Sequence, residues 1–152
     1  NYIQITNVQF EKGSVATDFE YLPYDLKLRR CQRYFTKSYR QGVVPGTAGL
    51  SAYNLGNPNF LCQYSTLGAG NNVMATSIQF PVQMRTKPTL VFYRPSTGTV
   101  NQVEDMAESG PLTLQHPAGT EYDENGIGLF QTTTVGIAGR GYQVQYTADA
   151  SL

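Results

Sequence analysis

Short segments of alternating apolar and polar residues, separated by glycines and prolines, run through most of this chain. The clearest segment is Val73–Met84, in which Ile78 and Phe80 fall on one face and Gln79 on the other. Side chains of a β-strand alternate between its two faces, so this period of two predicts a strand with one buried face. Pro81 lies inside the segment and lacks an N–H group, so we expect an edge position or a bulge there.

The same pattern recurs from end to end, with fifteen glycines and eight prolines among the 152 residues. Glycine and proline interrupt long helices and favour turns between short strands. Strands are predicted at Tyr2–Phe10, Tyr34–Tyr39, Leu50–Tyr53, Phe60–Tyr64, Val73–Met84, Thr89–Tyr93, Gly98–Val103, Pro111–Gln115, Ile127–Ile137 and Tyr142–Tyr146. About eight to ten short strands predict an all-β fold, namely an antiparallel β-sandwich or jelly roll.

One segment departs from this pattern and predicts a short helix near the N-terminus. In Asp25–Phe35, Leu26, Arg29 and Arg33 fall at helical spacing, and no glycine or proline interrupts them. We expect this helix to lead into the strand at Tyr34–Tyr39.

Turn signals separate the strands in the second half of the chain. Glu104–Gly110 is acidic and predicts a turn-rich stretch. Gly119–Gly126 is a polar loop that ends in Asn125–Gly126, a dipeptide typical of β-hairpins.

The charges balance, with eleven basic and eleven acidic residues. The only dense basic run is Lys27–Arg30, followed by Arg33, Lys37 and Arg40. We interpret it as a solvated helix face or a strip of salt bridges between subunits. Binding to nucleic acid depends on clustered cations against phosphate, so we expect no nucleic-acid partner. No apolar run approaches the roughly 18 residues that span a membrane, so we expect no membrane insertion.

The two cysteines, Cys31 and Cys62, are expected to be small buried residues with free thiols, and a disulfide between them remains an open alternative. No cysteine or histidine spacing matches a zinc site, so neither a metal nor another cofactor is expected. The single histidine, His116, has no acidic residue within four positions, and no catalytic residue is predicted.

Paired carboxylates would be needed for glycosidase chemistry. The candidate pairs are Glu104 with Asp105 or Glu108, and Glu121 with Asp123 or Glu124. Each group is expected to lie in one polar loop, where solvated charges are the simpler interpretation.

Carbohydrate recognition has softer requirements, namely an exposed aromatic ring and polar side chains that hold hydroxyl groups. Three clusters combine them: Tyr53 and Asn54 with Asn57 and Asn59; Tyr93 with Arg94; and Tyr122 with Asp123. Tyr53, Asn54, Asn57, Tyr93, Arg94, Tyr122 and Asp123 are therefore the predicted ligand-binding residues.

Three sequence blocks resemble one family of proteins. Ile5–Phe35 reads ITNVQFEKGSVATDFEYLPYDLKLRRCQRYF. It resembles a junction in bacteriophage tail fibres and tailspikes, where "VQ-hydrophobic-E-x-G-S-x-A-T-x-F-E" closes one β-sandwich module and "LxxCQRYF/Y" opens the next. Ile78–Leu90, IQFPVQMRTKPTL, resembles the "FPVxMRxxPT" strand–turn–strand of tail-fibre tip domains. Tyr146–Leu152, YTADASL, resembles the end of the same proteins.

The resemblance implies a C-terminal, receptor-binding tip domain that forms a parallel homotrimer. Residues 1–24 would be the end of a preceding module or a connector strand, and residues 25–152 the β-sandwich tip domain. Because the chain starts within a strand pattern at Asn1, we expect it to be the downstream part of a longer polypeptide. Its partners would be upstream fibre or tailspike modules and a host cell-surface glycan. Its place would be the virion, after synthesis in the cytoplasm of the bacterial host.

The expected function is non-catalytic attachment to a surface receptor of a host bacterium, with a polysaccharide as the receptor. Two alternatives stay open: a purely structural trimerisation or folding domain, and an accessory domain of a polysaccharide depolymerase.

Overall fold

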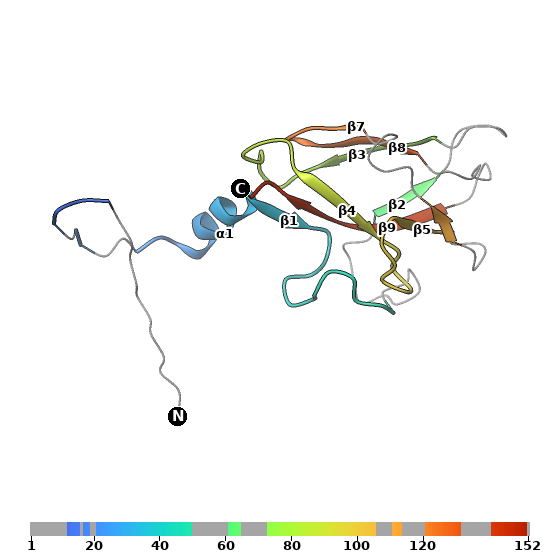
Figure 1. The fold of residues 1–152 in the computed structure, drawn as a ribbon, viewed down its shortest axis with the longest axis horizontal. Coiled ribbons are helices and arrows are strands. Elements are labelled where there is room, and N and C mark those ends of the chain that lie inside the picture. The colour runs from blue at the N-terminus through green and yellow to red at the C-terminus, as the bar shows by residue number, and fades with distance from the viewer. Residues whose placement is uncertain are drawn as a thin grey trace, which may run out of the picture.

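The computed structural model describes residues 12–15, 17–18, 21–49, 61–64, 73–105, 111–113, 121–131 and 141–151. Its elements are α1 (Tyr24–Gln32), β1 (Phe35–Lys37), β2 (Leu61–Tyr64), β3 (Val73–Gln79), β4 (Thr89–Tyr93), β5 (Gln102–Asp105), β6 (Pro111–Thr113), β7 (Glu121–Tyr122), β8 (Gly126–Gln131) and β9 (Gly141–Asp149) (Figure 1). All named strand pairs are antiparallel. The predicted all-β class with one short N-terminal helix is confirmed. The strands predicted at Tyr2–Phe10 and Leu50–Tyr53 lie outside the described residues.

Strand β9 is the centre of the larger sheet. On one side it pairs first with β2, along Gly141–Val144, and then with β1, along Thr147–Asp149. On its other side it pairs with β5 and then with β4, which reaches from Gln145 to Asp149. Each side of β9 is therefore lined by two successive strands, and the chain leaves the sheet between them. We call these connections excursion 38–60, of which only residues 38–49 are described, and excursion 94–101.

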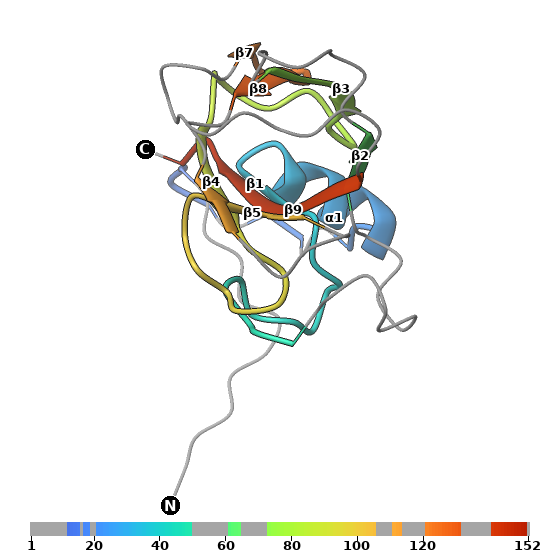
Figure 2. The ribbon, with the colours of Figure 1, turned by 90° about the vertical axis from the view of Figure 1, so that its right-hand side faces the viewer.

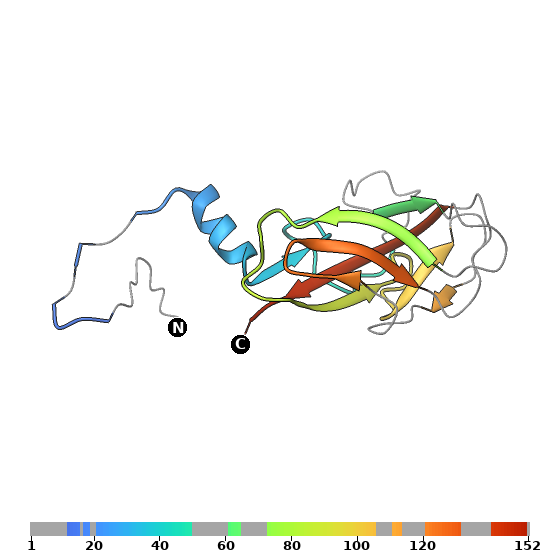
Figure 3. The ribbon, with the colours of Figure 1, turned by 90° about the horizontal axis from the view of Figure 1, so that it is seen from above.

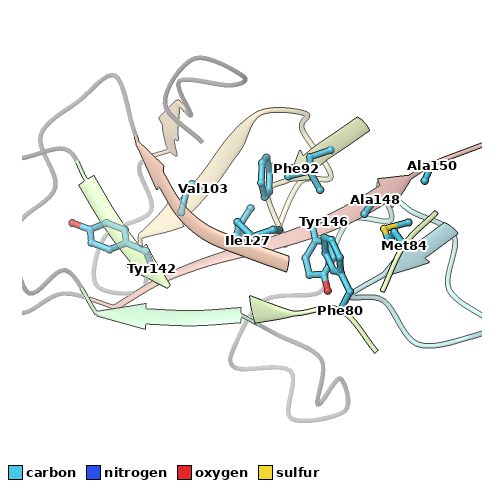
Figure 4. Close-up of a cluster of buried hydrophobic side chains, with 11 residues drawn as sticks. Phe80, Met84, Phe92, Val103, Ile127, Tyr142, Tyr146, Ala148 and Ala150 are labelled. Carbon is cyan, nitrogen blue, oxygen red and sulfur yellow. The ribbon is translucent and has the colours of Figure 1, made fainter. Parts of the chain in front are cut away.

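The smaller sheet has the order β3-β8-β7 and lies over one face of the larger sheet (Figure 2). Viewed from above, α1 and the C-terminus lie at the same end of the strands (Figure 3). The core lies between the two sheets and consists of Phe80, Met84, Leu90, Phe92, Val103, Ile127, Tyr142, Val144, Tyr146, Ala148 and Ala150 (Figure 4). Within it, the rings of Phe80 and Tyr146 pack with their centroids 6.1 Å apart.

Two predicted strand boundaries were wrong, one because of a proline and the other because of a turn. Strand β3 ends at Gln79, not at Met84, because the chain bends at Pro81, which cannot donate to a ladder. The bulge in this strand lies upstream of the proline, where the register with β8 shifts between Ala75 and Ile78.

Strand β5 begins at Gln102, not at Gly98, and it contains Glu104 and Asp105, which had been expected in a turn. The turn comes earlier in the chain, because Gly98 and Asn101 adopt φ values of 71° and 58°. Left-handed backbone of this kind reverses the chain instead of extending it.

The hairpin predicted at Asn125–Gly126 is present between β7 and β8. Its turn is built by Asp123, whose carboxylate accepts hydrogen bonds from the N–H groups of Asn125 at 2.7 Å and Gly126 at 3.1 Å. Neither Asn125 nor Gly126 has positive φ, so this is not the two-residue turn that the dipeptide usually forms.

Strand β9 is buried on both faces. Tyr142 and Val144 face the core, whereas Gln143 and Gln145 point the opposite way and are still only 1% and 0% exposed. Part of the cover over these glutamines comes from excursion 38–60, because Ser38 bonds to the Gln145 side chain. The alternation of β9 therefore does not mark a solvent-facing side.

Candidate functional site

A shallow groove of about 410 Å³ lies on the face of the larger sheet that points away from the core. Its lining residues are Phe35, Thr89, Val91, Tyr93, Thr147, Asp149 and Ser151, and we call it the outer-face groove. Pockets that hold small ligands typically measure about 300–1,000 Å³, so its size suits a small polar molecule.

Strand register places an aromatic ring, a carboxylate and a hydroxyl side by side in this groove. Asp149 of β9 is paired with Phe35 of β1 on one side and with Thr89 of β4 on the other. Directly paired residues share a face, with Cβ atoms about 4.5–5.5 Å apart. The Phe35 side chain remains 42% exposed, so one side of its ring is open to a ligand. The next row on this face, two residues along β9, contains Thr147 beside Val91.

Asp149 is held by its neighbour Ser151. The carboxylate oxygen Oδ1 accepts one hydrogen bond from the Ser151 hydroxyl at 2.6 Å and one from the Ser151 N–H at 2.8 Å. These bonds, that of the hydroxyl first, lower the pKa of the Asp149 carboxyl. Its other oxygen, Oδ2, has no partner among the described residues and is available to accept hydrogen bonds from a ligand.

Tyr93 also lines the groove. It lies two residues beyond Val91 along β4, next to excursion 38–60. Its ring packs edge-on against Tyr39, with centroids 5.9 Å apart and planes at 76°. The Tyr39 hydroxyl accepts a hydrogen bond from the Gly46 N–H at 3.1 Å, and burial raises the pKa of Tyr39. Tyr93 is thus fixed by contacts with the excursion and is only partly exposed.

Arg94 follows Tyr93 in the sequence but does not join the groove. Its side chain is 11% exposed and forms an ion pair of 3.6 Å with Glu104. Glu104 also accepts a hydrogen bond from the Ser96 N–H at 2.9 Å. Arg94 therefore joins β5 to excursion 94–101, with its side chain largely covered.

Tyr122 and Asp123 lie far from Tyr93 in the fold, beside a separate hollow of about 400 Å³ at the β7–β8 hairpin. The ammonium group of Lys87 lies 4.3 Å from the centre of the Tyr122 ring, and the same ring packs against the core. Asp123 uses its carboxylate in the hairpin turn, where hydrogen bonds, chiefly that of the Asn125 N–H, lower its pKa. Both side chains are occupied by contacts within the protein.

Tyr53, Asn54 and Asn57 lie outside the described residues. Of the predicted ligand residues that are described, only Tyr93 lines the outer-face groove. Phe35, Thr89 and Asp149 were missed, because strand pairing between distant parts of the chain brings them together. The local signal was the Asp149–Ala150–Ser151 spacing, which allows a serine to bind the carboxylate two residues before it.

Of the carboxylate pairs considered for glycosidase chemistry, the structure separates Glu104 from Asp105. Glu104 and Asp105 are consecutive in β5, so their side chains point to opposite faces. Glu108 lies outside the described residues. Among the residues that the structure describes, no three His, Cys, Asp or Glu side chains gather as metal ligands would.

Cys31 is free and exposed, so the structure contains no disulfide between it and Cys62, and the expected burial of Cys31 was wrong. Within the described ranges, no helix has the length and apolar content that crossing a membrane requires. Comparison of the chain with protein-family models, curated proteins and solved structures finds no match.

Proposed function

We propose that this chain is the distal domain of a bacteriophage tail fibre or tailspike. In this proposal the domain attaches without catalysis to a polysaccharide on the host bacterium, through the outer-face groove. The three sequence blocks support the family, and the chemistry of the groove supports the ligand class.

The row of Phe35, Asp149 and Thr89 is the observation that carries the proposal. The apolar face of a sugar ring packs on an exposed aromatic ring, while its hydroxyls donate to a carboxylate and exchange hydrogen bonds with a threonine. Charge-assisted hydrogen bonds of this kind are stronger than neutral ones. Because Asp149 is already held by Ser151, little side-chain freedom is lost when a sugar binds.

We expect a shallow groove to bind a sugar weakly. Weak sites become effective when several copies of the chain bind the same polysaccharide. Three copies in a parallel homotrimer would raise the overall affinity through effective concentration without any new contact. The two facing sheets support a β-sandwich or jelly roll for the tip domain. The helix α1, which buries none of its residues, supports a further contact with another chain.

The test compares groove variants with matched surface variants in host-cell adsorption and in glycan binding by the isolated chain. Phe35→Ala and Asp149→Asn are the groove variants. Val100→Ala removes a similarly exposed apolar side chain, 50% against 42%, and Asp25→Asn removes a carboxylate outside the groove.

We expect each groove variant to lower affinity for the polysaccharide at least about tenfold, which corresponds to 1.4 kcal/mol. The control variants should bind as the unmodified chain does. Equal binding by all four variants would refute the groove as the receptor site.

A purely structural trimerisation domain is the second candidate, favoured by the exposed apolar side chains around α1. Tyr24 is 64% exposed, Tyr34 48% and Leu26 39%. A trimer that binds neither host cells nor host polysaccharide would favour this alternative.

A further inference from the structure

Among the residues that the structure describes, β1 pairs with β9 on one side only, and its outer edge is unpaired. Ser38 donates its N–H to β9 at 3.1 Å, and Tyr34 accepts a bond from Ala150 at 2.7 Å. In an antiparallel ladder, alternate residues bond to the same neighbour, so the N–H and C=O groups of Phe35 and Lys37 point away from β9. In the described part of the chain, no group pairs with them. A free edge of this kind is a template for an added strand.

This edge opens into a hollow of about 650 Å³, which we call the edge groove. Its lining also includes Ile78 of the smaller sheet, Pro81 just after that strand, and Tyr146 of the core. Leu28 and Cys31 of α1 close one end. The groove therefore combines unpaired backbone groups with an apolar wall, which is the combination that binds an extended peptide.

The chain segment that contributes most of the lining of the edge groove is basic, and Lys37 of this segment is part of the lining. Six cations and no carboxylate occur between residues 27 and 40: Lys27, Arg29, Arg30, Arg33, Lys37 and Arg40. The single ion pair found among the described residues, between Arg94 and Glu104, involves none of them. A peptide that binds here is favoured when it is acidic.

The chain itself contains a segment with these properties. Thr17–Leu22 reads TDFEYL, in which Asp18 and Glu20 alternate with Phe19 and Tyr21. In an extended strand the two acidic residues fall on one face and the two aromatic residues on the other. Tyr21 is 85% exposed in the structure, so its ring is free of the core.

We propose that the edge groove binds the Thr17–Leu22 segment of a second copy as an added strand next to β1. The aromatic face of the segment enters the apolar groove, and the acidic face lies on the same side of the sheet as Lys37. The inference rests on the homotrimer proposed above, for which it names the contact, and it does not depend on carbohydrate binding.

The geometry before α1 favours exchange between copies over binding within one copy. Pro23 precedes the helix with φ −54° and ψ 147°, and a residue before proline is also held extended. The chain therefore enters α1 straight, and the described residues before the helix lie away from the sheets (Figure 1). To reach its own β1, the segment would have to reverse direction and run back along α1.

Disulfide trapping tests the contact, because Cys31 is a free thiol in the edge groove. Tyr21→Cys is made in a Cys62→Ser background that keeps Cys31. Val100→Cys in the same background is the control, since Val100 is 50% exposed and does not line the groove. The products are separated on denaturing gels without reductant after mild oxidation of the full chain.

We expect Tyr21→Cys to give covalent dimers and trimers at least about ten times faster than the control, and Cys31→Ser should abolish them. Intramolecular disulfide alone would show that each copy binds its own segment and would overturn the proposal. Crosslinking no faster than in the control would also overturn it.

A second experiment blocks the edge itself. Lys37→Pro removes the outward N–H, and proline is tolerated at a free edge. Lys37→Gln is the matched control, because it also loses the Nζ bonds to the carbonyls of Gln41 and Val43 but keeps the N–H. Association is measured by sedimentation, and binding of a monovalent sugar is measured separately on both variants.

We expect Lys37→Pro to weaken association at least about tenfold relative to Lys37→Gln, with sugar binding per site equal in the two variants. Equal association of the two variants would contradict strand addition. Phe35 lines both grooves, whereas Asp149 lines only the outer-face groove. Loss of sugar binding by Asp149→Asn therefore bears on the proposed function only, so the two failures are distinguishable.

Discussion

The contact between the two excursions gives a sharp prediction, because two glycine backbones meet there. Gly98 has φ +71°, and a Cβ at this position would lie 2.0 Å from the carbonyl oxygen of Gly46. Gly46 itself has φ +81° and lies against the Tyr93 ring. A further bond, from the Gly49 N–H to the Ser96 carbonyl at 2.9 Å, joins the same two segments. Substitution Gly98→Ala should therefore separate the excursions that cover Gln145 and support Tyr93.

The cost of Gly98→Ala has two parts. Left-handed backbone costs an L-residue roughly 1–2 kcal/mol. Overpacking against a backbone atom that must move costs about 1–3 kcal/mol more. We expect the free energy of unfolding to fall by about 2–5 kcal/mol, which corresponds to a Tm lowered by roughly 4–20 °C for a chain of this size.

Other glycines of the same chain separate these two parts. Gly49→Ala tests the backbone term alone, because Gly49 has φ +80° and an added Cβ would meet no described atom within 4 Å. Gly126→Ala tests the steric term alone, because its φ is not positive and its Cβ would lie 2.1 Å from the Ile78 carbonyl oxygen. Gly42→Ala is the control, with open space and no positive φ.

Urea unfolding at one protein concentration measures all four variants. We expect losses of about 1–2 kcal/mol for Gly49→Ala and about 1–3 kcal/mol for Gly126→Ala. Gly42→Ala should change stability by no more than about 1 kcal/mol, in the stabilising direction, because alanine restricts the unfolded chain. If Gly98→Ala unfolds at the same urea concentration as Gly42→Ala, the excursions do not meet as described.

Three further predictions concern the groove and the core. Hydrogen bonds from Ser151 lower the folded pKa of Asp149. The contribution of its ionised carboxylate to sugar binding should therefore persist as the pH falls to the ordinary aspartate pKa of about 3.9, and be lost only below it. A sugar affinity that already declines at about pH 5 would contradict this assignment. Phe92 is fully buried, so Phe92→Ala should lose about 3–5 kcal/mol in urea unfolding, and a loss below about 1 kcal/mol would contradict its place in the core. The side-chain amide of Gln143 is buried and has no hydrogen-bond partner at Oε1 or Nε2 among the described residues, so Gln143→Met should raise stability by about 1–3 kcal/mol, whereas a lower urea midpoint would show that the amide is needed.

Local patterns in the sequence were enough to predict many of the elements. Thr89–Tyr93 was predicted as a strand, and the structure has β4 at these residues, with Leu90 and Phe92 buried. The β7–β8 hairpin also followed from its polar loop. These predictions succeed because the period of two and the turn residues act within a few residues of the chain.

The candidate site was much less accessible to sequence reasoning. Tyr93 was predicted from its aromatic character, but Phe35 and Asp149 were not, although the structure pairs them across β1 and β9. They are more than a hundred residues apart in the sequence, and only strand register makes them neighbours. Arg94 was also predicted from its neighbour Tyr93, and only the structure shows its ion pair with Glu104.

The sequence by itself determined an all-β fold with one short helix, because alternation, glycine and proline act locally on backbone conformation. Only the tertiary structure decided which faces of the strands are open. In β9 both faces are buried at Gln143 and Gln145, whereas the end of the same strand carries Asp149 into an open groove. The physical reason is that burial of a strand face depends on segments that cross it from elsewhere in the chain, and no local pattern encodes their position.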